Sequence, residues 1–213
     1  KHSDYSAITS PRVALIYQPN ESAALKAMVG SAYRAPNAYE RFYDDGGVLQ
    51  KANPALLPER IRSVELAADF QVGQAGRFGV NIYNNDVRDL IDQVLDPADG
   101  LMLYSNQPHV QTHGIEFTAD RRWDGGSRVR GSLSRQRSSA ADGSELGNSP
   151  QWLGKLMLGL PMVAGWTLGA EWQGMSERRS LAGRVPGFGV LNVMLTSGRL
   201  LGAGELALGV YNV

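Results

Sequence analysis

The chain has 213 residues, of which 43% are hydrophobic and 20% are charged, a composition typical of folded rather than disordered proteins. Its 21 basic and 21 acidic residues give a formal net charge of +0, which argues against nucleic acid as a partner. Cysteine is absent, so disulfides, thiolate metal sites and a cysteine nucleophile are excluded. We expect a part of a longer protein, because the chain opens on Lys1 without a signal peptide.

Apolar and polar residues alternate along most of the chain, most clearly between residues 53 and 91. Val64, Leu66 and Phe70 share one side, while Glu65 and Asp69 share the other. A period of two predicts a β-strand with one apolar and one polar face. No apolar run reaches about 18 residues, so we expect no transmembrane helix, but a transmembrane strand needs only about 9 to 11 alternating residues.

The alternation predicts about ten strands, bounded by glycine and proline clusters. In chain order they cover residues 10–18, 23–34, 59–73, 77–91, 103–121, 126–138, 150–161, 165–175, 187–197 and 203–213. The segment 103–121 is unusually long, and two shorter strands separated by a bend near Pro108 are the alternative there. A sheet of this size would leave two edges exposed, so we expect strands outside this sequence to close it.

Short and long connections alternate along the chain. The short ones lie near Pro19 and across 73–76, 123–126, 164–165 and 197–202, whereas 35–58, 92–102, 139–149 and 176–186 are long and polar. This alternation predicts an antiparallel up-and-down transmembrane β-barrel, with short periplasmic turns and long external loops. Aromatic residues beside the short turns favour an interfacial girdle, although each could be an ordinary core aromatic: Tyr17, Phe78, Trp123 and Trp166.

Two motifs carry a resemblance to a known family. "GSAYRAPNAYERFY" (30–43) and "NPALLPERIRSVE" (53–65) resemble the barrel of TonB-dependent outer-membrane receptors of the siderophore and vitamin B12 type. In that family a strand ends in aromatic-Arg-Ala-Pro, and the next begins with Asn-Pro-x-Leu-x-Pro-Glu, followed by a glutamate six residues later. The matching positions here are Arg34, Pro36, Asn53, Pro54, Pro58, Glu59 and Glu65. Weaker similarity continues through 83–91, 105–117 and 209–213.

The resemblance implies an all-β fold in which residues 1–213 form part of a single barrel domain of 22 strands. The N-terminal plug and the final strand are not expected within this sequence. The implied function is active transport across the bacterial outer membrane. Extracellular loops bind a scarce metal chelate, an iron-siderophore or cobalamin, and TonB supplies the energy through the plug. Outer-membrane lipid would contact Val64, Leu66, Phe70, Val80 and Ile82, and a wet lumen or the plug would contact Glu65, Asp69, Asn81 and Asn85.

The candidate ligand contacts are Tyr39, Arg41, Phe42 and Tyr43, because aromatic and cationic groups on a long loop suit a large anionic or aromatic chelate. The alternative is that Arg34, Tyr39, Glu40 and Tyr43 only fold this loop and pin it to the barrel rim. Glu59 and Glu65 are expected to pair with lumen-side arginine or lysine.

Other functions have weaker support in the sequence. His109 and His113 could hold a metal with Glu116, but only three histidines occur and we expect no metal site and no cofactor. An outer-membrane barrel hydrolase would need a group such as Asp96, Ser105 and His109, which nothing in the sequence connects, so we expect no catalytic residues. A soluble secreted β-sandwich that binds a ligand is the remaining alternative, in which two sheets bury their apolar faces.

Overall fold

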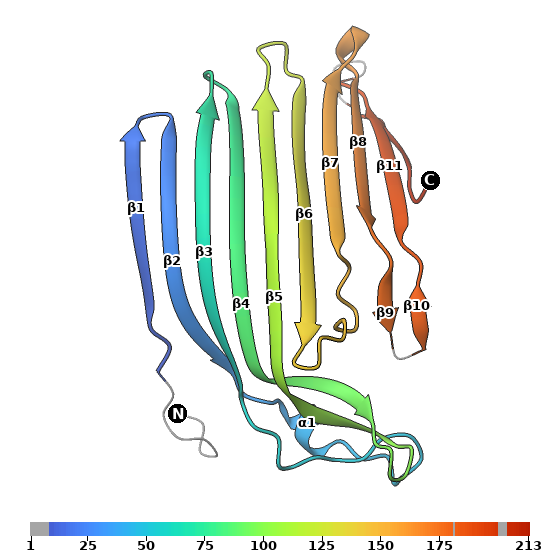
Figure 1. Cartoon of the computed structure of the whole chain (residues 1–213). Helices are drawn as coiled ribbons and strands as arrows, with labels where there is room; N and C mark the ends of the chain where they lie inside the picture. The colour runs from blue at the N-terminus through green and yellow to red at the C-terminus, as the bar shows by residue number, and fades with distance from the viewer. Residues whose placement is uncertain (1–8, 181, 200–203) are drawn as a thin grey trace.

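Ten strands form one antiparallel sheet in which each strand pairs with its neighbours in chain order (Figure 1). The computed structural model describes residues 9–180, 182–199 and 204–213. The sheet order is β1-β2-β3-β4-β5-β6-β7-β8-β11-β12. Its strands are β1 Arg12–Asn20, β2 Ala23–Arg34, β3 Glu59–Val72, β4 Gly76–Leu95, β5 Met102–Arg122, β6 Arg128–Ala140, β7 Trp152–Pro161, β8 Thr167–Met175, β11 Phe188–Thr196 and β12 Ala207–Val210.

The predicted meander is confirmed, and most strand boundaries agree within two residues. Short turns gather at one end of the sheet and long connections at the other (Figure 1). The last strand is shorter than the predicted 203–213, and part of that segment lies outside the described residues. β1 and β12 are the two edges of the sheet, so the barrel is not closed by these strands.

The long connections contain small elements that the alternation did not predict. Within 35–58 lies helix α1, Ala38–Phe42, with a capping box formed by Asn37 and Glu40. Within 176–186 lies a hairpin of β9, Arg178–Ser180, and β10, Gly183–Val185. The 3-10 turn η1, Val163–Gly165, closes the short connection between β7 and β8. Among the described residues, no helix has the length and apolar character required to cross a membrane.

β4 and β5 are the longest strands, with 20 and 21 residues. The register continues through the predicted bend, since Arg88 pairs with His109 and Leu90 with Gln107. Both strands curve sharply near the long-loop end and, in the view of Figure 1, then extend below the ends of β6 and β7. Asp89 adopts a φ of 56°. It lies opposite Pro108, whose backbone nitrogen carries no hydrogen to donate to the neighbouring strand. Residues 102–122 are therefore one continuous strand that bends.

The two faces of the sheet differ as the alternation predicted. Leu66 of β3 pairs with Ile82 of β4, and both are about half exposed on the convex face, at 57% and 52%. On the concave face the side chains of β3 are half-buried at alternate positions from Glu59 to Ala67, because the curved sheet shields them, and they become exposed from Asp69 onward. In the described residues the buried hydrophobic side chains are only Leu56, Ile91 and Val110.

So little buried apolar surface excludes the β-sandwich alternative, in which a second sheet would cover these side chains. An exposed apolar belt of this extent requires a nonpolar environment. The convex face therefore has the apolar character expected of a surface that contacts lipid.

Candidate functional site

Arg34 at the end of β2 fixes the long connection 35–58 to the barrel rim. Its Nε and Nη2 donate to the two carboxylate oxygens of Glu59 at 2.7 and 2.8 Å, and its Nη1 donates to Glu40 at 2.8 and 2.9 Å. The carboxylate side chains are largely shielded, with exposures of 11% for Glu40 and 15% for Glu59. One guanidinium thus joins helix α1 to the beginning of β3 through geometry that a lysine could not reproduce.

The other family-motif residues hold the same loop against β5. The Asn53 side chain donates to the Tyr104 carbonyl at 2.8 Å. Asn106 accepts from the Leu57 amide at 2.8 Å and donates back to the Leu57 carbonyl at 3.0 Å. Pro36 and Pro58 are buried at the two ends of the loop, and the Pro54 carbonyl accepts from Arg41 at 3.0 and 3.3 Å. These contacts satisfy backbone groups that an irregular loop would leave unpaired.

Two tyrosines of the loop, Tyr39 and Tyr43, gather with Tyr104 of β5, and we refer to the three as the tyrosine cluster. The Tyr39 and Tyr43 rings stack with centroids 4.5 Å apart, and Tyr104 of β5 lies edge-on to Tyr39 at 6.2 Å. Tyr39 and Tyr43 remain 51% and 40% exposed. Sequence reasoning missed Tyr104, because only the fold of the loop brings residue 104 next to residue 39.

The other two candidate ligand residues pack together. The Arg41 guanidinium lies over the Phe42 ring, 4.8 Å from its centroid, while it also bonds Pro54. Phe42 is 55% exposed. Arg41 therefore helps to fold the loop, and the rings of Tyr39, Phe42 and Tyr43 provide accessible aromatic surface on it.

Charged groups also link this loop to the connection between β4 and β5. Lys51 Nζ lies 2.5 Å from Asp96 and 2.7 Å from Asp99, which raises the pKa of Lys51 and lowers the pKa of both carboxyls. The Asp45 carboxylate accepts from the amides of Leu49, Gln50 and Val48, which lowers the pKa of Asp45. Both arrangements require ionised aspartates.

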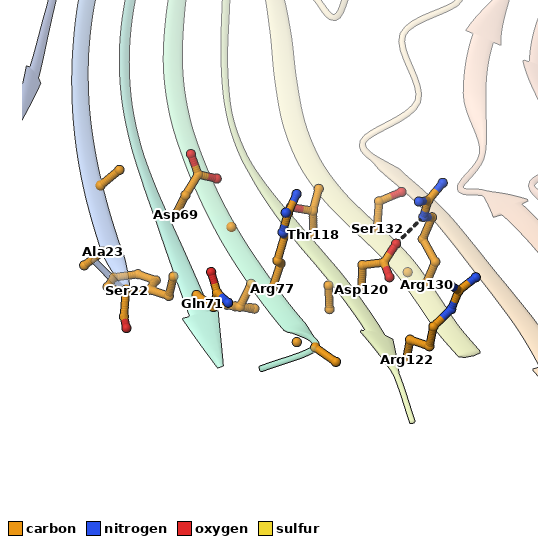
Figure 2. Close-up of a pocket in the computed structure, with 18 of the residues that line it drawn as sticks. Ser22, Ala23, Asp69, Gln71, Arg77, Thr118, Asp120, Arg122, Arg130 and Ser132 are labelled. Atoms are coloured by element: carbon orange, nitrogen blue, oxygen red, sulfur yellow. Dashed lines mark hydrogen bonds and ion pairs between the residues drawn. The ribbon is translucent and has the colours of Figure 1, made fainter. Parts of the chain in front are cut away.

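A polar groove occupies the concave face near the short turns (Figure 2). It has a volume of about 1000 Å³ and is lined by side chains of several neighbouring strands, including Asp69, Arg77, Thr118, Asp120 and Arg130. Asp120 accepts from Arg130 at 2.6 Å, as Figure 2 shows.

Further ion pairs complete the groove. Asp120 also accepts from Arg128 at 2.8 Å, and Lys26 donates to Asp69 at 2.6 Å. Asp69 lies on the polar concave face, the side that the alternation predicted for it, and lines the groove. The described residues supply no ion-pair partner for Glu65, whose register neighbours are Met28 and Tyr83, so the ion pair expected for Glu65 is wrong within that part of the chain.

The residues of the alternative sites do not come together. His109 and His113 project from one face of β5 and Glu116 from the other, and His109 bonds Asp86 at 2.6 Å. Asp96 is held by Lys51. Over residues 9–180, 182–199 and 204–213, no group of three histidine or acidic side chains is placed to hold a metal ion.

An antiparallel meander with an apolar convex face and a polar concave face defines the wall of a transmembrane β-barrel. The family model described as "TonB dependent receptor-like, beta-barrel" matches residues 1–213. The chain therefore belongs to the TonB-dependent receptor family, whose barrels lie in the bacterial outer membrane.

Solved structures with the same fold include the FrpB iron transporter from Neisseria meningitidis, which is 19% identical with a TM-score of 0.68 over 95% of this chain and 34% of its own. A ferric enterobactin receptor, PfeA, from Pseudomonas aeruginosa is 21% identical with a TM-score of 0.73, over 96% of this chain and 34% of its own. The copper transporter OprC is 20% identical with a TM-score of 0.74, over 95% and 33%. A search of curated proteins finds no match. The chain spans about a third of the length of these structures.

Proposed function

We propose that the protein containing this chain is an outer-membrane active-transport receptor that binds a scarce metal chelate at its external loops and releases it into the periplasm. The substrate class is an iron-siderophore or cobalamin. The similar structures include an iron transporter, a ferric enterobactin receptor and a copper transporter, which support a metal-containing substrate.

The tyrosine cluster carries this proposal. It lies on a long external loop that Arg34 and Lys51 hold in place, and two of its rings are accessible. Aromatic side chains supply large, rigid contact area for planar groups, and a braced loop loses little conformational entropy when a ligand binds. We include Arg41 and Phe42 in the site, because a cation over an aromatic ring suits a ligand that is both anionic and aromatic.

The polar concave face supports the partners that such transport requires. We propose that residues 1–213 form part of a single barrel domain of 22 strands, and that a plug domain lies against the groove around Asp69 and Asp120. Ion pairs with water access can exchange partners at low cost, which suits a surface along which a plug moves. TonB would act on that plug, and the protein would perform no covalent chemistry.

Growth and binding experiments on the complete gene product test the proposal. A deletion strain should lose growth on one chelate as the sole source of its metal, and TonB removal should have the same effect. The double variant Tyr39→Ala and Tyr43→Ala should weaken binding of that chelate to the purified receptor about tenfold. Tyr33→Ala, which removes an exposed ring from β2 and not from the cluster, is the matched control. Unchanged binding by the double variant would exclude the cluster as the ligand site.

A further inference from the structure

Five arginines lie on the convex, lipid-facing side of the sheet near its long-loop end. We call them the arginine rim: Arg60 and Arg62 of β3, Arg88 of β4, and Arg135 and Arg137 of β6. All five are exposed. They follow the same alternation as the lipid-facing residues, since Arg62 lies two positions from Val64 and Arg135 two positions from Leu133.

The boundary between the apolar belt and the arginine rim runs obliquely across the strands. Pairing across β4 and β5 places Arg62 of β3 in the same row of the sheet as Ser139 of β6. Arg135 of β6 lies four residues from Ser139, in the direction of the short turns. Four residues correspond to about 14 Å along a strand, and three strand spacings to about 14 Å across the sheet, which gives a tilt of roughly 45°. Transmembrane strands are tilted by about this angle, so the oblique boundary is level with the membrane plane.

Acidic side chains do not neutralise the arginine rim. On the same face and in the same rows of β3 to β6, Asp86 is the one carboxylate of the described residues, and it bonds His109 at 2.6 Å and lies 3.7 Å from Arg88. Within the described part of the chain, Arg60, Arg62, Arg135 and Arg137 form no ion pair with a carboxylate. Five cations facing one anion create a strongly positive strip directly above an apolar surface.

Aromatic rings accompany the rim as they do at membrane interfaces. The Arg135 guanidinium lies 5.3 Å from the centre of the Trp152 ring, which is 44% exposed on the same face. Tyr33 of β2 pairs in register with Arg60 and is 43% exposed. Tryptophan and tyrosine at this depth are typical of the headgroup region, where one end of the ring contacts lipid and the other water.

A small cavity extends the positive surface from β6 toward the hairpin of β9 and β10. It measures about 140 Å³, and four arginines but only two glutamates line it: Arg137, Arg178, Arg179, Arg184, Glu145 and Glu177. Glu177 pairs with Arg184. The cavity therefore continues the excess of positive charge at the end of the rim.

We propose that the arginine rim binds the phosphate groups of an anionic lipid in the outer leaflet of the outer membrane. Arginine presents a planar fork of donors that matches phosphate oxygens, and its long side chain can reach a headgroup while its methylene groups contact acyl chains. Exposed arginines on a lipid-facing surface are unfavourable at the bilayer centre but not at headgroup depth, where the oblique boundary places them. Because the arginine rim lies immediately above the apolar belt, the ligand that fits this surface is a lipid and not a soluble anion or a protein.

Native mass spectrometry of the complete purified receptor in neutral detergent tests this proposal. The probe is bisphosphorylated lipid A, and the comparison lipid is phosphatidylcholine of matched chain length. The double variant Arg62→Gln and Arg137→Gln should weaken binding of the phosphorylated lipid about 25-fold, because each arginine near an anionic surface contributes about fivefold. Binding of phosphatidylcholine should not change.

The matched control removes two cations from the concave face. Arg77→Gln with Arg122→Gln deletes the same charge near the polar groove and should change lipid binding less than twofold. Migration before and after boiling on a gel verifies that each variant is a folded barrel. Equal affinity of the unmodified receptor for the two lipids, or equal losses in the two double variants, would overturn the proposal. Inorganic phosphate competing as well as the lipid would also overturn it, because a free anion would then be the ligand.

Discussion

Replacing Arg34 with alanine tests whether one guanidinium holds the loop 35–58 in place. The change removes four hydrogen bonds and leaves two carboxylates, 11% and 15% exposed, facing each other without a cation. Charged hydrogen bonds of this kind contribute about 1.5 to 3 kcal/mol each when buried. Since the Arg34 side chain is itself 45% exposed, screening by water reduces the total, and we expect a loss of about 2 kcal/mol in local loop stability.

Hydrogen exchange in the complete receptor measures this quantity directly. The amides of Glu40, Arg41 and Tyr43 bond within the loop, at 2.9, 3.2 and 3.1 Å. A loss of about 2 kcal/mol corresponds to exchange about 30-fold faster at these positions. Amides in the middle of β3 should be unaffected, because their ladder bonds do not involve the loop.

Two further variants sharpen the Arg34 experiment. Arg34→Lys keeps the charge without the bidentate fork and should give an intermediate exchange rate. Arg60→Gln removes a neighbouring exposed arginine from the opposite face and should leave the loop unchanged. If Arg34→Ala does not accelerate exchange, the ion pairs do not brace the loop, and the reasoning on Arg34 is wrong.

Three other perturbations follow from the lipid belt, the glycine packing and the loop carboxylates. Leu66→Arg on the convex face should destabilise the barrel by about 2 to 4 kcal/mol, whereas Ala67→Arg on the concave face should be tolerated, as measured by the temperature at which the folded band disappears on a gel. Gly114→Val should cost about 1 to 3 kcal/mol, because a Cβ there would lie 2.6 Å from the Tyr83 hydroxyl oxygen, and the same gel assay detects the loss. Below about pH 4 the amide protection factors of the loop 35–58, corrected for the intrinsic exchange rate at each pH, should fall. The pKa of Asp45 is lowered in the folded loop, so its stabilising contribution is complete above the unfolded pKa and is lost as the pH falls through the folded pKa.

Each of these has a control or a contradicting result. Equal destabilisation by arginine at positions 66 and 67 would mean that the convex face does not contact lipid. Gly159→Ala adds a Cβ whose nearest neighbour is 4.0 Å away, so it should leave the gel assay unchanged. Asp45→Asn should remove most of the acid response of the loop, and an unaltered response would assign it to other carboxylates.

The sequence alone was sufficient for the meander. A period of two needs only neighbouring residues, and a turn needs only a few glycine, proline or polar positions, so both are local properties. The alternation of Val64, Leu66 and Phe70 with Glu65 and Asp69 predicted the two faces correctly. Helix α1 was missed although Asn37 and Glu40 carry a capping-box pattern, because five residues are too few for a visible helical period.

Tertiary structure alone decided how distant segments meet. Tyr104 joins Tyr39 because the bent end of β5 lies beside helix α1 (Figure 1), and no local pattern reports that bend. The arginine rim is scattered over three strands in the sequence, and only the strand register and the curvature of the sheet align it into one oblique strip. Local alternation determines which side of its strand a residue occupies, but pairing between strands determines its neighbours and its depth in the membrane, and depth decides whether an arginine contacts lipid chains or headgroups.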